Sequence, residues 1–109
     1  ALLTIEPEIE QALVDGDRRP WLAAVIVPSA EARAAAASDE ALKLLITETV
    51  ERANSRLSQI ERVRRFIIAD EGFTNENSQL TATLKVRRHV VRAQYQDRLA
   101  ALYTRGKQD

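Results

Sequence analysis

Residues 9–28, which read IEQALVDGDRRPWLAAVIVP, decide the fold of this chain. Residues 21–27 are apolar at every position and end on β-branched side chains, which is typical of a strand covered on both faces. Residues 9–14 form a second strand candidate, and residues 15–20 combine Asp-Gly with a proline, a strong turn signal. The pattern therefore predicts an antiparallel hairpin with a loop somewhat longer than the minimal type.

The residues after this hairpin predict helix, strand, polar loop and helix, in that order. Residues 30–37 are rich in alanine, and Ser38 is a good N-cap for a longer helix that begins with two acidic residues. That helix carries an apolar stripe at helical spacing: Leu42, Leu45, Ile46, Val50, Ala53 and Leu57. Residues 63–69 predict a third strand, with Phe66 and Ile68 on one face and Ile67 on the other.

The C-terminal part of the chain predicts a polar loop and a last helix. Residues 70–83 are rich in turn-forming side chains. The last helix begins near Arg87 and carries a single apolar stripe, formed by Val91, Tyr95, Leu99 and Leu102. The whole predicts one α+β domain over residues 1–109, with a small antiparallel or mixed sheet flanked by two main helices.

Composition excludes several classes of site. The 109 residues include no cysteine, so a disulfide framework and a thiolate zinc site are excluded. They include only one histidine, His89, so a histidine-based metal centre or catalytic triad is very hard to assemble. No apolar run approaches the roughly 20 residues that span a bilayer. The chain begins with Ala1 rather than methionine, and we expect it to be part of a longer protein.

Charge is distributed unevenly along the chain. The net charge is zero, but residues 1–51 carry ten acidic and four basic side chains, whereas residues 52–109 carry six acidic and twelve basic ones. Such a chain could present a basic face to a polyanion such as nucleic acid, and that binding would weaken steeply with salt. The alternative is that these charges are solvated or pair within the fold.

The polar loop and its exit, up to residue 88, form the candidate site. A loop of this length in so small a domain is usually functional or mobile. Thr81 and Thr83 offer hydroxyl groups, and Lys85 offers a hydrated point charge suited to a phosphate or carboxylate. Arg88 would lie about one helical turn from Lys85 if the helix has already begun at Lys85. A solvated lysine at a helix start is the simpler interpretation of these residues.

Residues 80–88, LTATLKVRR, resemble the terminal motif of the adenylate-forming acyl-CoA synthetases and ligases. The long-chain fatty acid branch of that family reads Leu-Thr-Pro-Thr-Leu-Lys-x-Lys-Arg there. The resemblance extends in order along nearly the whole chain, through residues 8–22, 25–28, 54–58 and 61–66. Ala82 replaces the proline of that branch, Arg87 replaces a lysine, and Leu84 stands where the wider family has glycine.

The resemblance implies the small, mobile C-terminal domain of a long-chain fatty acyl-CoA synthetase. Lys85 falls on the family's catalytic lysine, which stabilises the transition state in which the fatty acid carboxylate attacks the α-phosphate of ATP. Thr81, Thr83 and Arg88 are then supporting residues of the motif. ATP with Mg²⁺ and coenzyme A are substrates of the whole enzyme, bound mainly by its large N-terminal domain. The small domain then rotates for thioester formation, and no coenzyme A-binding residue is assigned.

The same resemblance sets the remaining expectations. The partner is the enzyme's own N-terminal domain, with no nucleic acid, no metal ligand and no transmembrane segment in this part. The location is cytoplasmic or peripheral at a membrane surface, and this part alone is expected to be inactive. The alternative within the family is a fatty acyl-AMP ligase, which passes the adenylate to a carrier protein; outside it, the alternative is the polyanion-binding module.

The other conspicuous residues favour structural interpretations. Trp21 is expected to pack in the core or at its edge, and His89 to lie on the surface of the last helix. Arg64 and Arg65 are expected to be charges on a strand face rather than phosphate ligands.

Overall fold

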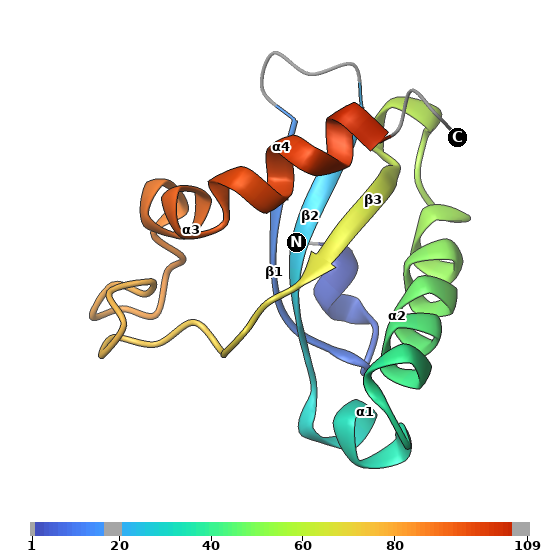
Figure 1. Ribbon diagram of the computed structural model, residues 1–109, viewed down its shortest axis with the longest axis horizontal. Coiled ribbons are helices and arrows are strands. Elements are labelled where there is room, and N and C mark those ends of the chain that lie inside the picture. The colour runs from blue at the N-terminus through green and yellow to red at the C-terminus, as the bar shows by residue number, and fades with distance from the viewer. Residues whose placement is uncertain (1, 17–20, 106–109) are drawn as a thin grey trace.

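The computed structural model describes residues 2–16 and 21–105, and the apolar strand lies at its centre. The elements in chain order are η1 (Leu2–Ile5), β1 (Ile9–Asp15), β2 (Leu22–Pro28), α1 (Ala30–Ala35), α2 (Asp39–Asn54), η2 (Gln59–Glu61), β3 (Val63–Ile68), α3 (Arg88–Gln94) and α4 (Gln96–Arg105). β2 pairs antiparallel with β1 and parallel with β3, so the sheet is mixed, as expected for the α+β class (Figure 1). Most of the predicted hairpin loop, residues 17–20, lies outside the described residues.

Strand β2 is covered on both faces, which confirms the expectation from its unbroken apolarity. Ala24 and Ile26 face one way, into a core shared with α2, while Val25 and Val27 face the other way, toward α3 and α4. Ala24, Val25 and Ile26 have no exposed surface. Because successive strand residues point to opposite faces, a continuous apolar run supplies both cores at once.

Helix α2 forms one covering layer and starts where predicted, but it ends at Asn54, so Leu57 of the predicted stripe lies beyond the helix and outside this core. The Ser38 hydroxyl accepts a hydrogen bond from Ala41 N at 3.1 Å and so caps the helix. The predicted stripe packs toward the sheet, with Ile46 fully buried, whereas Leu44 on the opposite face is 66% exposed. Phe66 and Ile68 of β3 join this core, and Ile67 joins the opposite one, as the alternation predicts.

The last helix differs from the prediction because it is interrupted. Val91, Tyr95, Leu99 and Leu102 do share one buried stripe, but α3 ends at Gln94 and α4 begins at Gln96. The residue between them, Tyr95, has left the helical conformation, with φ −110° and ψ 17°. Its ring is 2% exposed, and its hydroxyl accepts a hydrogen bond from Asp70 N at 3.0 Å. The helix is thus interrupted at Tyr95, whose large side chain packs in the core and also binds the start of the polar loop.

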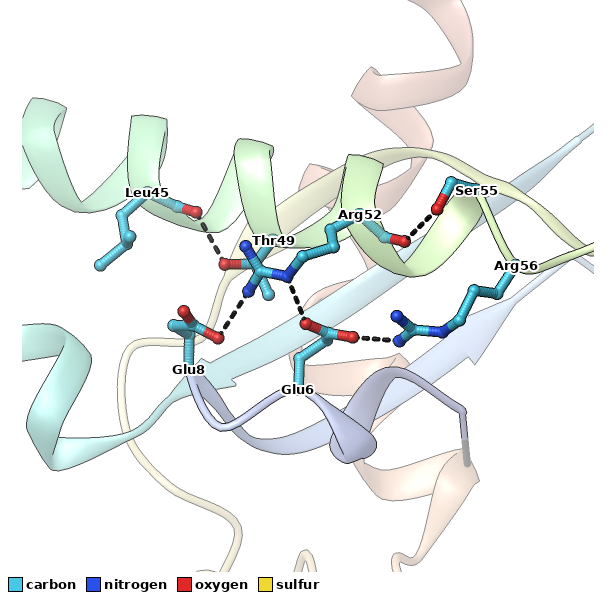
Figure 2. A network of polar contacts seen from close by, with 7 residues as sticks. All are labelled: Glu6, Glu8, Leu45, Thr49, Arg52, Ser55 and Arg56. Atoms are coloured by element: carbon cyan, nitrogen blue, oxygen red, sulfur yellow. Dashed lines mark hydrogen bonds and ion pairs between the residues drawn. The ribbon is translucent and has the colours of Figure 1, made fainter.

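Figure 2 shows a cluster of charged residues that ties the segment before β1 to α2. Arg52 Nε donates to Glu6 Oε1 at 2.7 Å, and Arg52 Nη2 donates to Glu8 Oε1 at 2.8 Å. Arg56 donates to the second Glu6 oxygen. The Glu6 side chain is only 6% exposed, and the hydrogen bonds from Arg56 and then Arg52 lower the pKa of its carboxyl below the ordinary value.

The Glu6 cluster predicts a specific acid sensitivity. Because folding lowers the pKa of Glu6, its contribution to stability is present above the ordinary value near 4.5 and is lost as pH falls through the lowered value. Glu6→Gln should therefore be less stable than the parent chain at neutral pH, and the difference should shrink in acid. Urea unfolding at pH 7 and at about pH 3 measures this. Glu8→Gln, which removes a single contact to Arg52, should show a smaller effect, and a pH-independent Glu6→Gln deficit would contradict the assignment.

The segment between β3 and α3 lies to the side of the sheet away from α2 (Figure 1). It contains an isolated antiparallel bridge between Leu80 and Val86 but no helix or longer strand. The fold therefore provides a compact base from which this segment extends, and all the residues of the candidate site except Arg88 lie in it.

Candidate functional site

The polar loop is fixed to the sheet where it begins. Gln11 of β1 donates from Nε2 to the carbonyl of Phe73 at 3.0 Å and accepts from the Phe73 N–H at 2.7 Å. The Phe73 ring is 2% exposed in the core beneath α3 and α4. The side chain of Gln11 thus pairs with Phe73 much as a neighbouring strand would, and the loop starts from a rigid position.

Asn77 organises the middle of the loop. Its Oδ1 accepts from the N–H groups of Thr74 at 3.0 Å and Gln79 at 3.1 Å. Its Nδ2 donates to the carbonyl of Gly72 at 2.8 Å and to the Glu71 carboxylate at 3.0 Å. Residues that indicated only a turn in the sequence therefore form a defined structure, because one amide side chain satisfies several backbone groups.

Lys85 lies at the end of a small lobe, residues 81–85, that closes on itself. Thr81 N donates to the Lys85 carbonyl at 2.8 Å, and Leu84 N donates to the Thr81 carbonyl at 2.9 Å. The Thr81 hydroxyl accepts from the Lys85 N–H at 3.0 Å and lies 3.1 Å from the Thr83 hydroxyl. The two threonines therefore serve the shape of the lobe.

Leu84 has a backbone conformation that favours glycine. Its φ is 64°, in the left-handed region, and its side chain is 69% exposed. A non-glycine residue there costs roughly 1–2 kcal/mol, and little burial offsets the cost at this position. The observation gives a physical reason why glycine suits this position in the wider family that the motif resembles.

Lys85 and Arg88 differ in what they contact. Among the residues that the structure describes, no carboxylate pairs with the exposed Lys85 ammonium. Arg88 instead donates from Nη2 to the carbonyl of Val14 at 2.6 Å and ties the start of α3 to β1. Helix α3 begins at Arg88, close to the predicted start near Arg87, so Lys85 is a loop residue and the condition for a spacing of one helical turn between the two cations is not met.

The other conspicuous residues occupy the structural positions expected for them. Trp21 is half-buried and packs against Tyr103, with ring centroids 4.6 Å apart, and His89 is exposed on α3. Arg64 is exposed and Arg65 half-buried on β3. Both line a cleft of about 450 Å³ between α2 and β3.

Sequence reasoning missed the residues that hold the loop: Gln11, Asn75, Asn77 and Tyr95. Gln11 carried a weak signal, since it is a polar residue in a strand whose neighbours are mostly apolar. Asn75 and Asn77 carried only the general signal of turn formers. Their partners could not be identified from the sequence because the contacts of Gln11 and Tyr95 span 62 and 25 residues along the chain.

The residues that the structure describes contain neither a membrane-spanning helix nor a cluster of metal-ligating side chains. No helix in residues 2–16 and 21–105 combines the length and the apolarity needed to cross a membrane. In the same residues, no group of three or more histidine, aspartate and glutamate side chains is arranged to hold a metal ion.

Comparison with known proteins places this arrangement in a family. The profile of the AMP-binding enzyme C-terminal domain matches residues 1–107. A long-chain-fatty-acid–CoA ligase of Mycobacterium tuberculosis is 33% identical over an alignment that covers 94% of this chain and 20% of the ligase. A chloroplastic long-chain-fatty-acid–[acyl-carrier-protein] ligase of Arabidopsis thaliana is 34% identical, with 88% of this chain and 13% of the relative covered.

A solved structure has the same fold. The adenylation domain of carboxylic acid reductase from Segniliparus rugosus, in complex with AMP and a co-purified carboxylic acid, superposes with a TM-score of 0.85 and 35% identity. The match covers 96% of this chain and 17% of that one. The chain thus spans about a fifth or less of the length of these relatives. From the family profile and these matches, we conclude that the chain belongs to the family of C-terminal domains of AMP-binding, adenylate-forming enzymes.

Proposed function

We propose that this chain is the mobile C-terminal domain of a long-chain fatty acyl-CoA synthetase and that Lys85 is its adenylation lysine. The observation that carries the proposal is the position of Lys85: an exposed ammonium without a carboxylate partner among the described residues, on a lobe closed by backbone hydrogen bonds. A cation in that state is available to an external anion. The family membership and the long-chain form of the motif at residues 80–88 support the same assignment.

The transition state of the adenylation reaction needs a nearby positive charge rather than a group that transfers a proton. In the first half-reaction, a carboxylate oxygen of the fatty acid attacks the α-phosphorus of magnesium–ATP. A P–O bond forms, the bond to the bridging oxygen breaks, and pyrophosphate leaves with the electron pair. Negative charge builds on the phosphoryl oxygens in the transition state, and a fixed ammonium there lowers the barrier electrostatically. Lys85 can do this without forming a covalent bond.

The second half-reaction transfers the acyl group. The thiol of coenzyme A attacks the acyl carbonyl, a thioester forms, AMP leaves, and the thiol proton passes to solvent. Lys85 has no part in this step, and we propose that the domain rotates against the large N-terminal domain between the two half-reactions. Neither ATP nor the fatty acid is assigned a pocket in this chain, so the isolated chain should have no ligase activity.

The proposal also names the acceptor of the acyl group, coenzyme A. The names of the relatives state different acceptors. One is a ligase that uses coenzyme A, and another is a ligase that uses acyl-carrier protein. We favour coenzyme A because residues 80–88 resemble the long-chain synthetase form of the motif, from which they depart at Ala82 and Arg87.

The full-length enzyme should form acyl-CoA from a long-chain fatty acid, ATP and coenzyme A. Replacing coenzyme A with a phosphopantetheinylated carrier protein should give no acylated carrier. Mass analysis of both products decides the matter, with a reaction lacking ATP as the control. Acylated carrier protein without acyl-CoA would show instead that the enzyme is a fatty acyl-AMP ligase.

A further inference from the structure

The lobe that carries Lys85 has little packing to hold it. Ala82, Thr83, Leu84 and Lys85 are all exposed, and Leu84 has the left-handed backbone described above. In a segment without burial, the orientation of the backbone depends on its hydrogen bonds. The residues that supply those hydrogen bonds therefore fix the backbone position from which the Lys85 side chain extends.

Thr81 is the residue on which the lobe closes. Its N–H donates to the Lys85 carbonyl, its hydroxyl accepts from the Lys85 N–H, and its carbonyl accepts from the Leu84 N–H. Both backbone polar groups of Lys85 thus bind to Thr81. Any shift of Thr81 moves Lys85 with it.

Asn75 holds Thr81 from outside the motif. Its Nδ2 donates to the Thr81 carbonyl at 2.7 Å and lies 3.3 Å from the Leu80 carbonyl. Asn75 itself begins a turn closed by the hydrogen bond from Ser78 N to its carbonyl at 3.0 Å. It follows Phe73 by two residues, and Gln11 fixes Phe73 to β1. A continuous set of contacts therefore connects the sheet with the lobe.

We infer that Asn75 is a positioning residue for Lys85: it holds the lobe in the orientation that the lysine needs during adenylation. The inference rests on the proposed function, since it assigns Asn75 an effect only through Lys85. Asn75 is exposed and lies outside both cores, so its amide acts on the lobe rather than on the stability of the domain.

Asn75→Ala in the full-length synthetase tests this inference. The rate of acyl-adenylate formation, measured by pyrophosphate exchange, should fall roughly three- to twentyfold, because the lobe loses a hydrogen bond and the lysine its alignment. The KM for ATP should change little. Thioester formation from supplied acyl-adenylate and the thermal unfolding midpoint should stay unchanged. Asn75→Asp should be slower still, because it replaces the donor with a carboxylate oxygen facing two carbonyl oxygens.

Glu76→Ala is the matched control, since Glu76 is the exposed neighbour of Asn75 in the same turn and makes no hydrogen bond or ion pair to another described residue. It should adenylate at the parental rate. If Asn75→Ala behaves like Glu76→Ala, or if both half-reactions and the unfolding midpoint fall together, the inference is wrong.

A double variant separates this inference from the proposed function. In a Lys85→Ala background, adding Asn75→Ala should slow adenylation no further, since the group that Asn75 positions is gone. A further loss in that background would show that Asn75 acts by another route. If Lys85→Ala alone leaves adenylation intact, the proposed function fails and the inference fails with it. If Lys85→Ala slows adenylation and Asn75→Ala does not, only the inference fails.

Discussion

Lys85→Ala in the full-length synthetase should slow acyl-adenylate formation by about 10²- to 10³-fold, the usual cost of removing one preorganised group that stabilises a transition-state charge. Thioester formation from supplied acyl-adenylate should be largely unaffected, because in the proposed function the lysine acts only while charge builds on the α-phosphate. Pyrophosphate exchange measures the first half-reaction, and release of AMP from synthetic acyl-adenylate with coenzyme A measures the second. An equal loss in both would show that the part assigned to Lys85 is wrong.

Two variants define what Lys85 contributes. Lys85→Arg keeps the charge but replaces a compact ammonium with a planar guanidinium, so we expect an intermediate rate. Lys43→Ala removes an exposed lysine from α2 and should leave both half-reactions at the parental rate. The same loss in Lys43→Ala as in Lys85→Ala would mean that overall charge, rather than the position of Lys85, matters.

The sheet could be predicted from the sequence because its signals are local. The unbroken apolar run of β2 requires two covering layers, and the stripe on α2 supplies one of them. Ser38 acts as the N-cap that its position before two acidic residues predicts. Each of these features depends on residues a few positions apart, where spacing alone carries the information.

The geometry of the site could not be predicted in the same way. The motif singled out Lys85, and the predicted helix start near Arg87 places it before the helix, but the sequence did not show that Thr81 binds both of its backbone groups. The interruption at Tyr95 was missed because the apolar stripe continues through it. Such features depend on contacts between distant parts of the chain, and side-chain amides such as that of Gln11 have no preferred partner in sequence.

The uneven charge of the chain has a structural explanation for several of its arginines. Arg52 and Arg56, in the basic half, pair with Glu6 in the acidic half. Arg92 likewise lies 3.2 Å from the Asp15 carboxylate. Several basic side chains of the second half thus form ion pairs with acidic side chains of the first half. These pairs weigh against a general polyanion-binding face, whereas Lys85 has no such partner among the described residues.

Tyr95 connects the stability of the domain with the site, and truncating it should have the largest effect on folding. Its ring lies in the core beneath α3 and α4, and its hydroxyl accepts from Asp70 N at the start of the polar loop. Tyr95→Ala removes the ring and should lower the free energy of unfolding by about 3–5 kcal/mol. Tyr95→Phe removes only the hydroxyl and should cost about 0.5–1.5 kcal/mol. Urea unfolding of this chain measures both.

The difference between the two variants shows how the core supports the loop. Tyr95→Phe keeps the ring and its contact with the Arg98 guanidinium, which lies 5.3 Å from the ring centroid, so its effect reports the bond to Asp70 alone. His89→Ala, at an exposed position of α3, is the control and should change the free energy of unfolding by no more than about 0.5 kcal/mol. A Tyr95→Ala cost as small as that of His89→Ala would mean that the ring is not part of the core. A Tyr95→Phe cost near zero would mean that water replaces the hydroxyl at Asp70, and that the loop is held at its start by Gln11 instead.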